Sequence, residues 1–204
     1  MGPHIESFSL RKYMSELSKR VSTFTDSVIR RMTRISDACP GCINLSQGFP
    51  DFDPPKELMD ALEVVSHKGP HQYSVTYGAE NFREALSAKV RKTMNRDIDP
   101  DKEIVVTCGG TEAMMCVVMT ICNPGDKVMV FSPFYENYGA DAILSGATPI
   151  FIPLVPPTYS FDINQIEQGF KDGAKAIIVC NPSNPCGKVF TREELVAIGN
   201  LALK

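Results

Sequence analysis

Residues 127–152 read KVMVFSPFYENYGADAILSGATPIFI, and this stretch decides the predicted fold. Residues 127–131 and 148–152 are short, mostly apolar runs of strand length. Residues 134–145, which lie between them, are long enough for a helix. Because a helix that joins two strands is the usual crossover of a parallel sheet, we expect two parallel strands here.

The same alternation continues on both sides of this stretch. Further strands are expected at residues 104–107 and 174–180, and further helices at residues 111–122 and 162–170. A last helix is expected to begin after Thr191. Asp162 is expected to cap its helix, and Thr191 is expected to form a capping box with Glu194. Four apolar strands alternating with helices predict an α/β fold, with a mostly parallel sheet and helices on both faces.

The residues before position 100 are predicted to be mainly helical. Apolar residues recur at helical spacing over 15–38, which predicts a first helix. After an extended segment at 43–50, a second helix is expected to begin with Asp53 as its N-cap and Pro54 as its first residue. A third helix is expected over 78–94.

The composition excludes several classes of protein. The chain has 204 residues, of which 43% are hydrophobic and 22% charged, and its formal net charge is −3. These values are typical of a soluble globular protein and exclude a collagen-like, coiled-coil or disordered chain. A charge so near zero argues against a nucleic-acid partner. No apolar run approaches the roughly 18 residues of a membrane-spanning helix, and the N-terminus has no secretory pattern. We therefore expect a cytoplasmic protein without a membrane partner.

The seven cysteines are expected to be free thiols. Residues 39–42 read Cys-Pro-Gly-Cys, a spacing that can be redox-active or bind zinc. There is no second pair at zinc spacing and no preceding strand, so we interpret this motif as a turn that carries two thiols. We predict no metal site. The cysteines in apolar stretches are interpreted as buried apolar residues; they are Cys108, Cys116, Cys122 and Cys180.

Three strand-to-helix junctions carry residues that could bind a ligand, because ligands of open α/β sheets bind at the carboxyl ends of the strands. At the first junction, Gly109, Gly110 and Thr111 precede a helix. Glycines allow close approach to the backbone, and the free N–H groups at a helix start attract anions. These residues therefore suit a phosphate group, although tight packing alone would also explain the two glycines.

The second and third junctions carry aromatic and amide side chains. Residues 132–138, SPFYENY, place aromatic rings at a strand end, where they could stack on a planar cofactor or simply pack under a loop. Residues 180–187, CNPSNPCG, contain two prolines and a glycine that fix the loop. A fixed amide is a good donor for orienting the oxygen of a ring.

In this order, the three junctions resemble those of the pyridoxal-phosphate enzymes of fold type I. The similarity is to class I and II aminotransferases, in the branch of aspartate, aromatic and kynurenine aminotransferases. It extends over residues 26–204 and includes NLSQGFPDF at 44–52 and YSVTYG at 73–78. The resemblance implies a partial fold-type-I large domain, pyridoxal 5'-phosphate as the cofactor, and amino acid and 2-oxo acid substrates.

The resemblance also implies a role for each matching residue at the cofactor. Gly109, Gly110 and Thr111 would hold the cofactor phosphate. Tyr135 would stack on the pyridine ring, and Asn184 would donate a hydrogen bond to its phenolic oxygen.

Further positions would serve the substrate and the subunit interface. The backbone N–H of Gly48 would bind the substrate carboxylate. Tyr73 would reach the cofactor phosphate of the second subunit in a homodimer. Tyr77 is the competing tyrosine, but Tyr73 has the family's spacing to Gly78.

The sequence departs from the family pattern in two ways. Cys186 stands where the family has Thr in Asn-Pro-Thr-Gly. The family's Schiff-base lysine, pyridinium-binding Asp, second ring-oxygen Tyr and carboxylate-binding Arg all lie further along, and this sequence has no counterpart of them. We therefore nominate no catalytic residue. We expect an N-terminal fragment, inactive alone, with a helical arm or small-domain segment over 1–45 and an incomplete cofactor-binding large domain over 46–204.

Three alternatives stay open at this point. The same cofactor site would serve a carbon–sulfur lyase. The missing lysine would suit a non-catalytic half-domain that binds a phosphate-bearing ligand or pairs with a separate chain. The chain could also be an α/β domain whose loops merely mimic the family.

Overall fold

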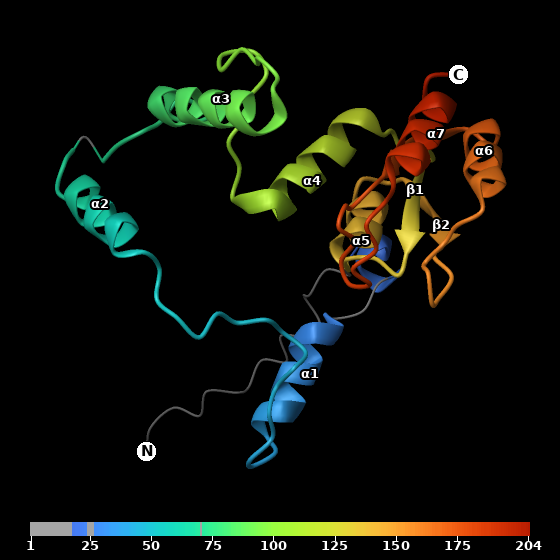
Figure 1. Cartoon of the computed structure of the whole chain (residues 1–204), viewed down its shortest axis with the longest axis horizontal. Helices are drawn as coiled ribbons and strands as arrows, with labels where there is room; N and C mark the ends of the chain where they lie inside the picture. Colours follow the sequence, from blue (N-terminus) through green and yellow to red (C-terminus); the bar gives the residue numbers. More distant parts are fainter. Residues whose placement is uncertain (1–17, 24–26, 70) are drawn as a thin grey trace, which may run out of the picture. The chain divides into compact units, whose positions relative to one another are not determined.

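The computed structural model describes residues 18–23, 27–69 and 71–204 (Figure 1). Among these residues the chain forms two compact units, one of residues 18–23, 27 and 121–204 and one of residues 28–69 and 71–120. In chain order the elements are η2 (Lys19–Thr23), α1 (Val28–Asp37), α2 (Lys56–Ser66), α3 (Glu80–Met94), α4 (Gly109–Ile121), β1 (Lys127–Ser132), α5 (Asn137–Leu144), β2 (Thr148–Pro153), α6 (Ile163–Lys171), β3 (Ala174–Ile178) and α7 (Arg192–Ala202). None of the helices within the described residues is long and apolar enough to cross a membrane.

The parallel sheet is confirmed, with the strand order β2-β1-β3. Lys127 of β1 pairs with Thr148 of β2, and Val128 pairs with Ala176 of β3. The prediction of a fourth strand at 104–107 is wrong for the described residues. A strand needs a ladder of hydrogen bonds with a neighbour. Val106 instead donates a single backbone bond, 2.9 Å long, to the carbonyl of Tyr77.

β1 lies at the centre of the sheet and is buried along most of its length. Successive side chains of a strand point to opposite faces, so Met129 and Phe131 share one face and Val128 and Val130 the other. All four side chains are at most 5% exposed. Met129 and Phe131 belong to the main core cluster, together with Ile166 of α6. Burial on both faces is what the continuous apolar run of β1 predicts.

The two crossovers of the sheet run in opposite directions. The chain passes from β1 through α5 to β2 at one edge, and then from β2 through α6 to β3 on the other side of β1. Crossovers of this kind are right-handed, so α5 and α6 cover opposite faces of the sheet.

Two predicted helix starts are confirmed in detail. Asp162 caps α6, and its side chain accepts a bond of 2.9 Å from the N–H of Asn164. Thr191 and Glu194 form the predicted capping box of α7, with both reciprocal bonds present.

Three other helix predictions need correction. α2 begins at Lys56 with Pro55 as its N-cap, rather than at Asp53 and Pro54. Pro55 forces the residue before it out of the helical region, so Pro54 cannot begin the helix. α5 begins at Asn137, three residues after the predicted start. The segment 15–38 is not described as one helix: η2 is a 3-10 helix, α1 covers the second part, and residues 15–17 and 24–26 lie outside the described residues.

All seven cysteines are free thiols. Cys122 is buried, as predicted, and Cys180 is half-buried. Cys108 and Cys116 are exposed, so the interpretation of these two as buried residues is wrong. Cys108 lies in the turn before α4, and Cys116 is on a side of α4 that is turned away from the core, so apolar neighbours in the sequence do not bury either residue.

Candidate active site

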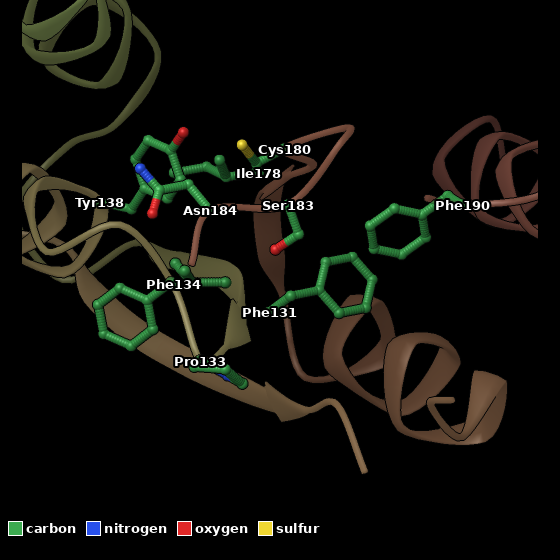
Figure 2. A pocket seen from close by; sticks show the side chains of 10 residues that line it. Phe131, Pro133, Phe134, Tyr138, Ile178, Cys180, Ser183, Asn184 and Phe190 are labelled. Atoms are coloured by element: carbon green, nitrogen blue, oxygen red, sulfur yellow. The ribbon is translucent and has the colours of Figure 1, made fainter. Parts of the chain in front are cut away.

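A pocket opens at the carboxyl ends of β1 and β3 (Figure 2). Its lining residues come from the two strands, the segments that follow them and α5: Val130, Phe131, Pro133, Phe134, Tyr138, Ile178, Cys180, Ser183, Asn184 and Phe190. β1 and β3 are neighbours, but the chain leaves β1 toward the face of α5 and leaves β3 toward α7, which packs on α6. The pocket therefore lies at the point where the strand order reverses, the usual ligand site of an open α/β sheet.

The loop that carries Asn184 is held by its own hydrogen bonds. The side-chain oxygen of Asn181 accepts a bond of 3.0 Å from the N–H of Phe190. The N–H of Ser183 donates to the carbonyl of Lys188 at 2.8 Å, and the N–H of Gly187 donates to the carbonyl of Ser183 at the same distance. Asn184 thus sits on a closed loop, with its amide facing the pocket in Figure 2.

A partly buried ion pair fixes this loop to α7. The Nζ atom of Lys188 lies 2.9 Å from Oε1 of Glu194, and the side chain of Lys188 is only 7% exposed. The same Nζ lies 5.0 Å from the ring centre of Phe190, close enough for a cation–π interaction. The other carboxylate oxygen of Glu194 accepts from the N–H of Thr191. One glutamate therefore connects the pocket loop with the cap of the helix.

Tyr138 adds a hydroxyl group to the pocket. Burial is the main cause that raises the pKa of Tyr138 to about 12, and a hydrogen bond with the thiol of Cys180 is the second. The hydroxyl is therefore neutral near pH 7 and can donate a hydrogen bond. Tyr138, Cys180 and Ser183 lie in the two junctions that the sequence indicated as ligand-binding, but sequence reasoning gave none of the three a role of its own.

Tyr135, the predicted stacking residue, is half-buried beside the pocket but is not one of the residues that line it. Its ring packs edge-on against Tyr138, with 5.8 Å between the ring centres. Its stacking role stays a prediction.

The predicted phosphate site at the start of α4 belongs to the other unit. Gly109 has φ +78°, and a Cβ atom built on Gly109 or Gly110 meets no heavy atom of the described residues within 4 Å. Tight packing within the described part of the chain therefore does not explain these glycines. The carboxylate of Glu112 accepts from the N–H of Cys108 and holds the turn before the helix. Together with Thr111, this open helix start fits a phosphate group.

Gly48 and Tyr73, the predicted substrate and interface residues, also lie in the unit of residues 28–120. Both are exposed, and the side chain of Tyr73 is fully so. Asn44 fastens the start of the Gly48 segment, because its side chain donates to Thr33 Oγ1 at 3.3 Å and accepts from the N–H of Ser46 at 2.9 Å. The roles of Gly48 and Tyr73 stay predictions.

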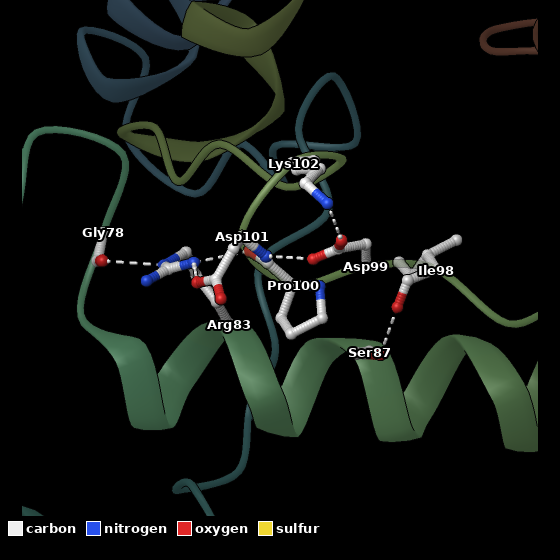
Figure 3. Close-up of polar contacts among 8 residues, drawn as sticks. All are labelled: Gly78, Arg83, Ser87, Ile98, Asp99, Pro100, Asp101 and Lys102. Carbon is white, nitrogen blue, oxygen red and sulfur yellow. Dashed lines mark hydrogen bonds and ion pairs between the residues drawn. The ribbon is translucent and has the colours of Figure 1, made fainter.

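A buried arginine organises the segment that ends the Tyr73 motif (Figure 3). Arg83 is 4% exposed, and its Nε atom donates to the carbonyl of Gly78 at 3.0 Å. Its Nη1 atom donates to the carbonyl of Pro100 and to the carboxylate of Asp101, each at 2.5 Å. Two carbonyl oxygens and one carboxylate oxygen thus accept hydrogen bonds from the buried guanidinium group, which compensates its charge. The same contacts join α3 to residues 98–102.

No group of three or more His, Cys, Asp or Glu side chains in the described part of the chain could hold a metal ion. The pocket of Figure 2 is lined instead by apolar and aromatic side chains with an amide, two hydroxyls and a thiol, which suit an organic ligand.

The comparisons with known proteins agree with this chemistry. Residues 40–204 match the family model "Aminotransferase class I and II". Kynurenine–oxoglutarate transaminase 3 of Rattus norvegicus is 34% identical over 198 residues, which cover 92% of this chain and 43% of that protein. The probable N-succinyldiaminopimelate aminotransferase DapC of Mycobacterium tuberculosis is 32% identical over 186 residues, 90% of this chain and 47% of that protein. The chain thus spans about half the length of the curated relatives it matches.

Solved structures give the same result. YbdL of Escherichia coli, described with a methionine aminotransferase function, matches with a TM-score of 0.86 and 27% identity over 93% of this chain and 50% of that one. Aspartate aminotransferase of Thermus thermophilus with maleate matches with a TM-score of 0.84 and 28% identity, over 93% of this chain and 51% of that one. The fold is that of part of a fold-type-I aminotransferase. The chain belongs to the class I and II aminotransferases, a family whose enzymes depend on pyridoxal 5'-phosphate.

Proposed function

We propose that the whole protein is a pyridoxal-phosphate-dependent aminotransferase, which moves an amino group from an amino acid to a 2-oxo acid. The observation that carries the proposal is the match of residues 40–204 to the family. The pocket at the ends of β1 and β3 supports it, because it contains the amide of the Asn-Pro-x-Gly motif. The proposal concerns the whole protein, since this chain spans about half the length of the relatives that it matches.

In this proposal the chain's residues take the cofactor roles that the family resemblance implies. The backbone N–H groups of Gly109 and Gly110 and the hydroxyl of Thr111 bind the phosphate. Asn184 donates a hydrogen bond to the ring oxygen from its fixed loop, and Tyr135 stacks on the ring. When bound, the cofactor supplies a carbonyl carbon for the amino group and a ring that accepts electrons. These residues of the chain hold the phosphate and orient the ring.

The substrate and partner roles extend the same proposal. The N–H of Gly48 binds the substrate carboxylate, and the exposed side chain of Tyr73 contacts a second subunit in a homodimer. We propose a cytoplasmic protein, with the helical arm over 1–45 and part of the large domain over 46–204. The free thiols support this location, because disulfides are rare in a reducing compartment.

Amino-group transfer by the whole protein tests the proposed activity. The protein is incubated with pyridoxal 5'-phosphate, 2-oxoglutarate and one amino acid at a time, including kynurenine, methionine and aspartate. Formation of glutamate, dependent on the cofactor and on the amino acid, is the expected result. Release of pyruvate from a cysteine conjugate without glutamate would favour the lyase instead. Phosphate binding without either reaction would favour the non-catalytic half-domain.

A further inference from the structure

The motif at residues 39–42 forms a tight turn between α1 and the segment that carries Gly48. The N–H of Cys42 donates to the carbonyl of Cys39 at 3.1 Å, and Gly41 has φ +76°. Proline at the second position and a glycine of positive φ at the third are the signature of a type II β-turn. In such a turn the first and fourth Cα atoms lie within about 7 Å of each other. That separation is close to the range of about 4.4–6.8 Å in which a disulfide forms.

Ser36 in the last turn of α1 contacts both cysteines. Its carbonyl accepts a bond of 3.0 Å from the N–H of Cys39. Its hydroxyl donates to the sulfur of Cys42 at 3.5 Å. The thiol of Cys42 therefore lies near the C-terminal end of α1. Cys39, the first residue of the turn, follows the same end of the helix. Both cysteines are free and exposed.

We propose that Cys39 and Cys42 are a site of reversible disulfide formation, with a small-molecule disulfide such as oxidised glutathione as the oxidant. One thiolate attacks the glutathione disulfide, which forms a mixed disulfide and releases one reduced glutathione. The second thiolate attacks the mixed disulfide at the protein sulfur and releases the second reduced glutathione. The two cysteines lose two protons and two electrons, and one oxidised glutathione becomes two reduced molecules.

The surrounding structure favours ring closure over other uses of the two thiols. A structural zinc site needs four ligands, and no third His, Cys, Asp or Glu joins this pair among the described residues. The turn is already closed by a backbone bond, so the disulfide orders little additional chain. The next residues are held as well, because Asn44 bonds to Thr33 of α1. The disulfide would therefore join two points that the reduced turn already brings together.

The test uses the whole protein equilibrated in glutathione buffers of increasing oxidised fraction. Remaining thiols are alkylated, and peptides are analysed by mass spectrometry. We expect an internal disulfide in the 39–42 peptide and the loss of two alkylated thiols. Cys39→Ser or Cys42→Ser should abolish it, whereas Cys108→Ser, which removes another exposed thiol, should leave it unchanged. Two alkylated cysteines, or glutathione adducts on both, at the most oxidising ratio would overturn the proposal.

A second variant tests the turn itself. In Gly41→Ala the added Cβ atom would have no atom of the described residues within 4 Å, but the alanine would have to adopt φ +76°. The reduced chain can relieve this strain by leaving the turn, whereas the disulfide cannot, so the equilibrium constant for ring closure should fall by about fivefold, the equivalent of roughly 1 kcal/mol. An unchanged constant would show that the turn does not prepare the pair. Neither experiment depends on the proposed aminotransferase activity, because both read the thiols directly.

Discussion

At Gly78 there is no room for a side chain. It has φ +109°, and a Cβ atom there would lie 2.3 Å from a methyl carbon of Val106. Gly78→Ala should therefore destabilise the protein by about 2 kcal/mol or more, from backbone strain and the clash together. Gly125→Ala is the matched control, because Gly125 has φ +94° but no atom of the described residues within 4 Å. Urea unfolding of both variants separates the two contributions, and equal losses would contradict the steric part.

Asp141 predicts an unusual dependence of stability on pH. The residue is 4% exposed, its Oδ2 atom has no hydrogen-bond partner among the described residues, and burial raises its pKa above 3.8. The folded state then binds the proton more tightly than the unfolded state. Stability should fall as the pH rises from 3.8 through the folded pKa. Asp141→Asn should remove this loss and become more stable than the natural protein near pH 7, while the two should be similar near pH 3.

Asp126 provides a control with the opposite sign. The N–H of Asn123 and the ion pair with Lys175 lower the pKa of Asp126, so its contribution is present above 3.8 and is lost as the pH falls. Asp126→Asn should therefore be less stable than the natural protein near pH 7. Free energies of unfolding at several pH values measure both differences. If the free energy of unfolding of the two variants changed with pH in the same way, the opposite pKa shifts of Asp141 and Asp126 would be refuted.

At the scale of elements, the ion pair between the pocket loop and α7 can be compared with an exposed pair of the same residue types. Lys188→Met keeps the apolar stem but leaves Glu194 without its partner, so we expect a loss of about 1–3 kcal/mol. Lys171→Met breaks the ion pair of Lys171 with Glu167, in which the two side chains are 63% and 42% exposed, respectively. This change should cost about 0.5 kcal/mol or less. Thermal and urea unfolding test the difference, and similar losses would show that burial of Lys188 contributes nothing.

The elements also show what a sequence can predict. The caps of α6 and α7 were predictable because each rests on residues within one turn. The start of α2 could have been predicted as well, since Pro55 follows Pro54. The absence of a strand at residues 104–107 could not be predicted, because a strand depends on a distant partner that the local pattern does not reveal. For the same reason the sequence indicated the segments 132–138 and 180–187 but gave no role to Tyr138 or Cys180, which meet in the pocket only once β1 and β3 pair.

At the scale of the whole molecule, the chain is shorter than the relatives that it matches. The relatives are about twice as long as this chain. A test of the site therefore needs the whole protein, and it must separate a loss of ligand contact from a loss of folding.

Two asparagines of the same loop allow that separation. Asn184 lines the pocket and is exposed, so Asn184→Ala in the whole protein should weaken pyridoxal 5'-phosphate binding about tenfold and change its absorbance, with stability altered by less than about 0.5 kcal/mol. Asn181 accepts the N–H of Phe190, so Asn181→Ala should destabilise the protein by about 1–3 kcal/mol. Cofactor titration and urea unfolding of both variants give the comparison. Unchanged affinity and absorbance in Asn184→Ala would remove Asn184 from the cofactor site, because a donor to the ring oxygen cannot be lost without changing the ring.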